Sequence, residues 1–323
     1  MSKAKQRFEI QLAKIKPIML QAKSKRNPGQ WLSTNNARTP LFNLEALSKM
    51  YGDVYNSKDF SKIEKQAKEI EDALGDVDHY VVQSKQINTN TKIPKAAKEY
   101  FRSKTNEANN RLNQLLLEEN WLNGKRIAKM ELRIGRAKWM EDVDEVSTIC
   151  DYYIKEIKEI EQFVAQTSCN FTNMEDHVHE LRRKIRWLSI YPQALNGLAK
   201  LVDRKTTPKY FEKYMVKEII NSPFNKLTPD AALTHHIQFY KENYLALSWM
   251  IAELGKIKDA GLGLFAIAEA LVATESCTHE EAEIKALHLL GKKQKSTLAL
   301  LEDASVICQE YFSKKLLTNL LVK

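Results

Sequence analysis

The sequence has 323 residues, of which 43% are apolar and 28% are charged, and its 50 Lys and Arg against 41 Asp and Glu give a net charge of +9. This composition excludes a disordered chain, and the length suffices for one large domain or for two fused halves. A membrane protein is not expected, because there is no run of about 18 apolar residues and the first residues do not resemble a secretory leader. The expected location is the cytoplasm.

Helix is the expected secondary structure throughout. Glycine and proline are scarce, with 10 and 8 residues, whereas Lys, Glu, Ala and Leu are abundant. The four cysteines lie far apart and form no CxxC pair, so neither a disulfide framework nor a zinc site is expected. The positive charge favours an anionic partner but does not identify it.

The first half, residues 1–140, contains several amphipathic segments. Residues 3–25 predict a helix disturbed near Pro17, and further helices are expected at about 40–50, 57–75 and 95–122. The helix at 57–75 is expected to end at Gly75. Beyond Gly124, basic residues recur at i, i+3, i+7 and i+10 and form a stripe beside an apolar seam. This stripe consists of Arg126, Lys129, Arg133 and Arg136.

The second half, residues 141–323, opens with a helix at about 142–166. The acids of its first turn, Asp142, Asp144 and Glu145, are better explained by the unpaired backbone amides at a helix start than by a metal ion. Later helices are expected at 205–221, 229–253, 260–273, 278–290 and 292–321, with Gly255 ending the second of these.

Residues 177–191, HVHELRRKIRWLSIY, form the most informative stretch of this half. On a helix, the apolar residues Val178, Leu181, Ile185 and Leu188 make one stripe, and a separate face is basic. The basic face consists of His179, Arg182, Arg183 and Arg186. Such a face is either an ordinary solvated surface or a binding surface that folding does not require.

The run His179-x-x-Arg182-Arg183-x-x-Arg186-x-Leu188 resembles the histidine-arginine signature of the CHAD family, the conserved histidine α-helical domains. A later segment, Leu254-Gly255 followed by Asp259, resembles that family's LG-x-x-x-D segment. The resemblance implies a helical protein of two similar halves, which binds inorganic polyphosphate through basic residues on its inner helices.

A weaker sequence similarity in the first half supports a duplication of the helical repeat. Residues 73–78, ALGDVD, are similar to residues 253–258, ELGKIK. The counterpart of the signature would then include Arg38, with Asn35 in place of the histidine and with Phe42 and Asn43 in place of basic residues. The first half is therefore expected to be a degenerate repeat.

These observations predict an all-α helical bundle of two similar up-and-down halves, with a basic groove or tunnel between them. The two basic stripes would form the walls of a polyphosphate site. No catalytic motif is present, so neither an enzyme nor a cofactor is expected. Two other functions stay open: sequence-independent binding of nucleic acid, and a helical scaffold for an acidic protein partner.

Overall fold

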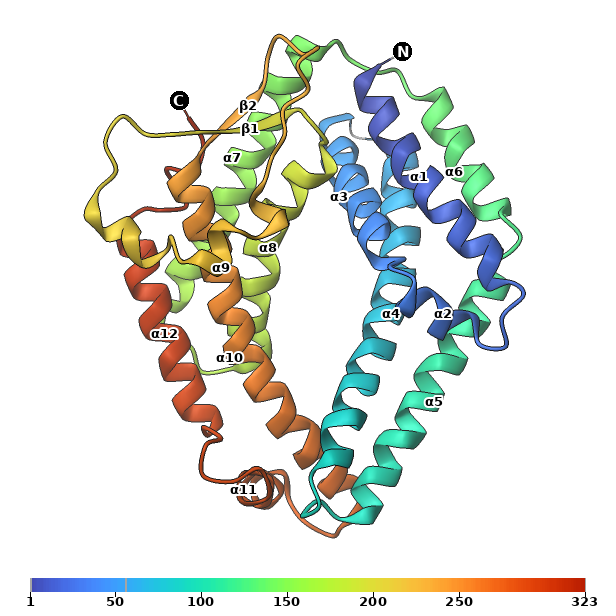
Figure 1. Ribbon diagram of the computed structural model, residues 1–323, viewed down its shortest axis with the longest axis vertical. Coiled ribbons are helices and arrows are strands. Elements are labelled where there is room, and N and C mark those ends of the chain that lie inside the picture. Colours follow the sequence, from blue (N-terminus) through green and yellow to red (C-terminus); the bar gives the residue numbers. More distant parts are fainter. Residues whose placement is uncertain (1, 56, 323) are drawn as a thin grey trace.

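The computed structural model describes residues 2–55 and 57–322, and it consists almost entirely of helices (Figure 1). The predicted all-α class is confirmed. The helices of the first 140 residues lie together on one side of the molecule. They are α1 (Lys3–Ala22), α2 (Pro28–Thr34), α3 (Arg38–Tyr55), α4 (Lys58–Thr89), α5 (Lys95–Glu118) and α6 (Lys125–Arg136).

The other side of Figure 1 contains the later elements. Its helices are α7 (Asp142–Thr167), α8 (Glu180–Ala194), α9 (Lys217–Ile220), α10 (Lys241–Thr274), α11 (His279–Leu290) and α12 (Thr297–Ser313). A π-helical turn (Met174–His179) leads into α8, and 3-10 turns occupy Lys209–Lys213 and Pro223–Asn225. Two short parallel strands, β1 (Ala199–Val202) and β2 (Ile237–Tyr240), pair in the register Ala199 with Ile237.

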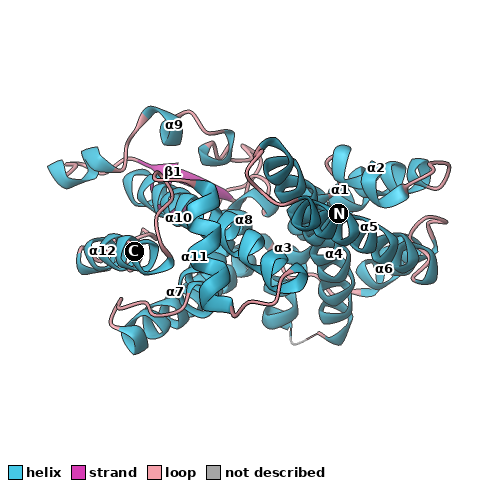
Figure 2. Cartoon of the chain, turned by 90° about the horizontal axis from the view of Figure 1, so that it is seen from below, coloured by secondary structure: helices cyan, strands magenta, loops and turns pink. Residues whose placement is uncertain are grey.

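Four helices occupy the middle of the molecule. Seen from below, α3, α4, α8 and α10 lie between α7 and α12 on one side and α5 and α6 on the other (Figure 2). Contacts between helices agree with this view: α3 packs against α4 and α8, and α10 packs against α8 and α12. The two sides also meet at their lower end, where α10 packs against α5.

The predictions that Gly75 and Gly255 end helices are wrong. Both glycines lie inside the longest helices, α4 and α10. Glycine is costly within a helix, but tertiary packing can outweigh that cost of about 1 kcal/mol. At both positions the lack of a side chain leaves room for an arginine from a neighbouring helix.

The predicted helix at 205–221 is also wrong, because only a 3-10 turn and the four-residue α9 form there. The predicted helix at 229–253 begins instead at Lys241. The preceding residues include β2, whose backbone pairs with β1. A pairing between strands so far apart in sequence leaves little trace in local periodicity.

A buried ion pair links the two sides of the molecule. Nη1 of Arg7 on α1 lies 2.5 Å from Oε1 of Glu145 on α7, and their side chains are 3% and 1% exposed. The hydroxyl of Tyr51 on α3 donates to the same carboxylate. Glu145 is therefore a buried partner of a cation rather than only an acid near exposed amides. Asp144 is exposed, and the side chain of Asp142 lies outside the described residues.

Most of the buried apolar side chains form one cluster that contains residues of both halves. A second, smaller cluster lies where the ends of α4 and α5 meet α10 and α11. Each fully buried Leu or Ile stabilises the fold by about 1.5–3 kcal/mol. None of the helices in the described part of the chain combines the length and the apolar character that crossing a membrane requires.

Candidate anion-binding site

The helix of the predicted signature begins with the π-helical turn and continues as α8. The side-chain oxygen of Asn173 accepts hydrogen bonds from the backbone amides of Glu175 and Asp176, which helical bonding leaves free. The predicted apolar stripe is confirmed, because all four of its residues are fully buried. They are Val178, Leu181, Ile185 and Leu188.

Arg182 of α8 is half-buried and lies against α10. Its Nε donates a hydrogen bond to the backbone carbonyl of Ile251, at 3.3 Å. Beside it is Gly255, where a Cβ atom would lie 3.2 Å from Nε and 3.3 Å from Nη2 of Arg182. The glycine thus allows the guanidinium to approach the backbone of α10. Arg182 is positioned by that backbone and not by a carboxylate.

Arg186 of α8 reaches the first half of the chain. Its Cζ lies 4.8 Å from the ring centroid of Phe42 on α3, which is cation-π geometry. The Phe42 ring also meets Trp187 edge-on, at a centroid distance of 6.1 Å. The guanidinium of Arg186 therefore lies where α8 packs against α3.

Lys258 of α10 completes the group, and sequence reasoning did not assign it a role. It stands three residues after Gly255, so it shares a face of α10 with the glycine that Arg182 contacts. This three-residue spacing was the signal in the sequence from which the role of Lys258 could have been inferred. Lys258 is half-buried and close enough to Arg182 and Arg186 for their charges to affect it.

Arg182, Arg186 and Lys258 together form what we call the cation cluster. Burial lowers the pKa of all three side chains. The charge of Arg182 further lowers the pKa of Arg186, and both arginines lower that of Lys258. The charge of Asp259 raises the pKa of Arg182 and of Lys258. Burial and mutual repulsion therefore both oppose the charged state of the cluster.

Throughout the described chain, no carboxylate forms an ion pair with a member of the cation cluster. The ion pairs at this end of α8 use other cations. Nδ1 of His179 lies 2.8 Å from Oε2 of Glu175, and the largely exposed Arg183 pairs with Glu180. Of the four basic residues predicted on this face, Arg182 and Arg186 thus come together, whereas His179 and Arg183 have acidic partners of their own.

The second predicted wall does not face the first. Helix α6 packs against α1 and α4 and lies at the outer edge of the molecule, on the opposite side from α8 (Figure 1). Arg126 pairs with Glu119, and Arg133 lies near Asp59 and Gln66. Lys129 and Arg136 are exposed. The amphipathic pattern of α6 was visible in the sequence, but its neighbours in space were not.

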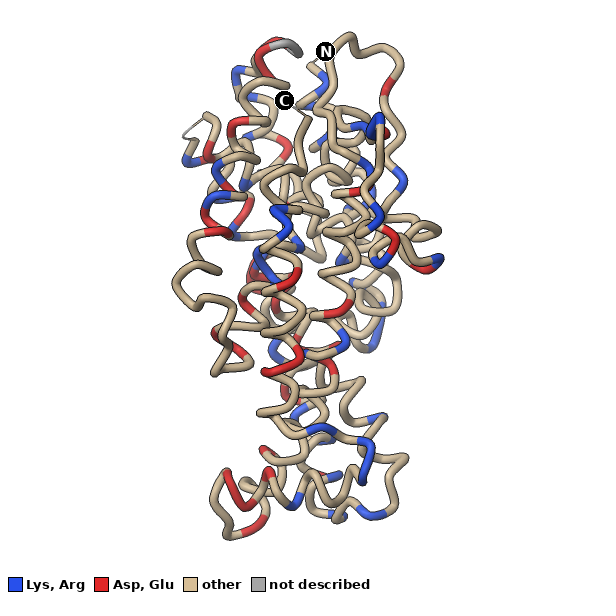
Figure 3. The backbone as a smooth tube through the Cα atoms, turned by 90° about the vertical axis from the view of Figure 1, so that its left-hand side faces the viewer, with Lys and Arg blue, Asp and Glu red and all other residues tan. Residues whose placement is uncertain are grey.

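The positions of basic and acidic residues are mixed over the molecule. In the backbone tube of Figure 3, Lys and Arg positions are interspersed with Asp and Glu positions. Hollows lie between α1 and α6 and beside α2. A continuous basic groove between the two halves stays a prediction.

The fold and the site define an all-α protein with a half-buried cation cluster on two of its inner helices. Comparisons of the chain with protein-family models, with curated proteins and with solved structures found no match. The resemblance to the CHAD family therefore stays a prediction that rests on the quoted segments.

Proposed function

We propose that this protein binds inorganic polyphosphate, or a closely similar polyanion, at the cation cluster, and that it does so in the cytoplasm as a binding protein rather than an enzyme. The observation that carries this proposal is three half-buried cations that form no ion pair with a carboxylate of the described chain, although Asp259, Glu71 and Glu175 act on them at longer range. An uncompensated charge is costly to bury. A bound anion would offset that cost.

The side chains of the cluster suit phosphate. A guanidinium presents several N–H donors in a planar fork that matches phosphate oxygens, and a lysine adds a compact charge. These groups recognise phosphoryl oxygens without reading a base sequence. Nucleic acid is less favoured because the indole near the cluster, Trp187, packs against Phe42 and Tyr191.

The test is a calorimetric titration of the full chain with long-chain polyphosphate at two salt concentrations, beside single-stranded RNA and duplex DNA of matched charge. Polyphosphate binding should survive moderate salt, whereas binding of the nucleic acids should weaken steeply. Equal and salt-sensitive binding of all three would contradict a shaped site. It would indicate only a positive surface.

The variant pair for this test removes equal charge from two places. Arg182→Ala with Arg186→Ala should weaken polyphosphate binding by at least about 100-fold, because charge-assisted hydrogen bonds contribute about 1.5–3 kcal/mol each. Lys129→Ala with Arg136→Ala on the distant α6 should change it by less than about threefold. If both double variants lose binding equally, net charge rather than the cluster is responsible. Circular dichroism would verify that both are folded.

A further inference from the structure

The two halves of the chain contain the same arginine-glycine contact. In the first half, a Cβ atom at Gly75 of α4 would lie 3.3 Å from Nη2 of Arg38 on α3. In the second, Gly255 of α10 stands in the same relation to Arg182 of α8. Each of the two similar segments of sequence, residues 73–78 and 253–258, therefore places its glycine against an arginine of a neighbouring helix.

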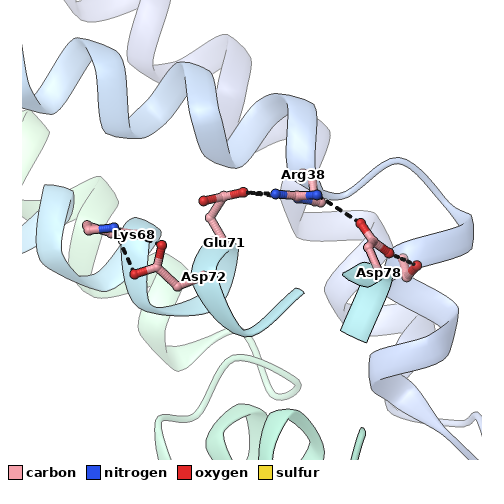
Figure 4. Close-up of polar contacts among 6 residues, drawn as sticks. Arg38, Lys68, Glu71, Asp72 and Asp78 are labelled. Atoms are coloured by element: carbon pink, nitrogen blue, oxygen red, sulfur yellow. Dashed lines mark hydrogen bonds and ion pairs between the residues drawn. The ribbon is translucent and has the colours of Figure 1, made fainter. Parts of the chain in front are cut away.

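The chemistry around the two arginines is opposite. Arg38 donates from Nε to Oε1 of Glu71 at 3.0 Å, and from Nη1 to Oδ2 of Asp78 at 2.9 Å (Figure 4). Glu71 stands four residues before Gly75, and Asp78 stands three residues after it. The side chains of Glu71 and Asp78 are 8% and 31% exposed, so this is a partly buried pairing.

Counting from Gly255 gives the corresponding residues of the second half. The residue four before it is Ile251, which offers Arg182 only its backbone carbonyl, and the residue three after it is Lys258. Each carboxylate that holds Arg38 is thus replaced, one by an apolar side chain and one by a cation. In the second half the arginine has no ion-paired carboxylate among the described residues and has Lys258 as a positive neighbour, and Asp259 acts on it only at longer range.

The two copies are adjacent. Phe42 stands four residues after Arg38, as Arg186 stands four residues after Arg182. The Phe42 ring contacts both guanidinium groups, with Cζ of Arg38 at 5.4 Å and Cζ of Arg186 at 4.8 Å from its centroid. An anion that extended from the cation cluster past Phe42 would meet the carboxylates that already pair with Arg38.

We infer that, of the two arginine-glycine contacts, only the one in the second half forms an anion site, because Glu71 and Asp78 occupy in the first half the place that the ligand takes in the second. This inference rests on the proposed function. It implies that the site binds a short run of phosphoryl groups. A short phosphoanion such as tripolyphosphate, or part of a longer chain, could supply this run.

The first measurement separates this inference from the proposed function. Tripolyphosphate should bind the wild-type chain with a stoichiometry of one and displace fluorescent long-chain polyphosphate completely. If long chains bind but tripolyphosphate neither binds nor competes, the single short site is wrong although polyphosphate binding stands. If neither ligand binds, the proposed function fails and this inference fails with it.

Exchanging the residues between the halves gives the sharper test. Ile251→Glu with Lys258→Asp should give Arg182 the acidic partners that Arg38 has, and tripolyphosphate binding should weaken by at least about 100-fold. Because Arg182 gains acidic partners in this variant instead of being left without contacts, the thermal unfolding of the variant should stay close to that of the wild type. Wild-type affinity in the folded variant would overturn the inference.

The reverse change uses isosteric substitutions, which should preserve the fold. It therefore tests the inference even if the first variant does not fold. Glu71→Gln with Asp78→Asn removes both charges around Arg38 and should tighten tripolyphosphate binding about tenfold, since a freed cation then borders the site. The control is Asp76→Asn on the same helix, where the carboxylate pairs with Arg111 of α5. Unchanged affinity in the double variant, or an equal gain in the control, would count against the inference.

Discussion

Glu45 of α3 is a carboxylic acid in an unfavourable place. It is 4% exposed, and within the described residues its Oε2 has no hydrogen-bond partner. Burial raises its pKa to about 8, and although Lys68 opposes the shift, the nearby carboxylates add to it. Those carboxylates are Glu64, Glu71 and Asp72. The side chain is therefore more easily accommodated when it is protonated.

The raised pKa of Glu45 makes a pH-dependent contribution to stability. A pKa in the folded state above the ordinary glutamate value of 4.5 means that the folded state binds the proton more tightly than the unfolded state does. This contribution is fully present below about pH 4.5 and is lost as the pH rises through about 8. Near pH 9, Glu45→Gln should therefore raise the free energy of unfolding by about 2 kcal/mol relative to the wild type, whereas near pH 5 the two proteins should unfold at similar urea concentrations. The same difference at both pH values would show that titration is not its cause.

At this scale the sequence allows only part of the site to be predicted. Arg182 and Arg186 could be assigned because their spacing sets them apart from the apolar stripe of the same helix. Lys258 could not, because its relation to them depends on how α8 packs against α10. The burial of Glu45 escaped prediction for the same reason, since an acid among apolar helical residues can face either solvent or a neighbouring helix.

Among the elements, the Arg7–Glu145 pair links α1 to α7 within an aromatic environment. Removing one member of such a pair leaves a buried charge without compensation, which costs about 3–5 kcal/mol. We expect Arg7→Met to lower the free energy of unfolding by that amount. Adding Glu145→Gln should restore part of it, because the remaining buried carboxylate is then replaced by a neutral group that still accepts a hydrogen bond from Tyr51.

An exposed ion pair provides the control for this prediction. Lys16 and Glu131 lie 3.0 Å apart with side chains 45% and 42% exposed, so Lys16→Met should cost less than about 1 kcal/mol. Urea unfolding of the variants would measure these differences. A cost for Arg7→Met no larger than that for Lys16→Met would mean that the buried pair does not stabilise the junction.

Helix periodicity was a reliable guide to buried faces and a poor guide to neighbours. The apolar seams of α6 and α8 could be predicted because they depend on residues within a few turns of one another. The position of α6 could not be predicted, because its amphipathic pattern would fit packing on α1 and α4 as well as packing beside α8. Gly75 and Gly255 illustrate the same limit, because each is explained by an arginine from another helix.

Over the whole molecule, the asymmetry between the halves matters more than the net charge of +9. Basic and acidic residues are interspersed along the backbone (Figure 3), whereas the partners of the arginine differ between the two arginine-glycine contacts. A sequence repeat predicts similar backbones. Whether the chemistry is also repeated depends on individual positions, such as Asp78 and Lys258.

The continuous core predicts that the two halves unfold together. Leu41 and Leu47 of α3 share one buried cluster with Leu181 and Ile185 of α8, and every tryptophan of the chain belongs to this cluster or packs against it. Because a shared core favours all-or-none unfolding, we expect tryptophan fluorescence to report a single urea transition.

Removing one tryptophan at a time changes how much each half contributes to the fluorescence signal. Trp31→Phe removes a reporter from the first half, and Trp249→Phe removes one from the second. If the core is one cooperative unit, the fluorescence that remains in each variant should give a single transition, and two-state fits to fluorescence and to circular dichroism should agree in midpoint and slope. Two resolved fluorescence transitions, differing in amplitude between the variants, would instead mean that each half unfolds on its own. The contact of Arg186 with Phe42 would then join two independent domains.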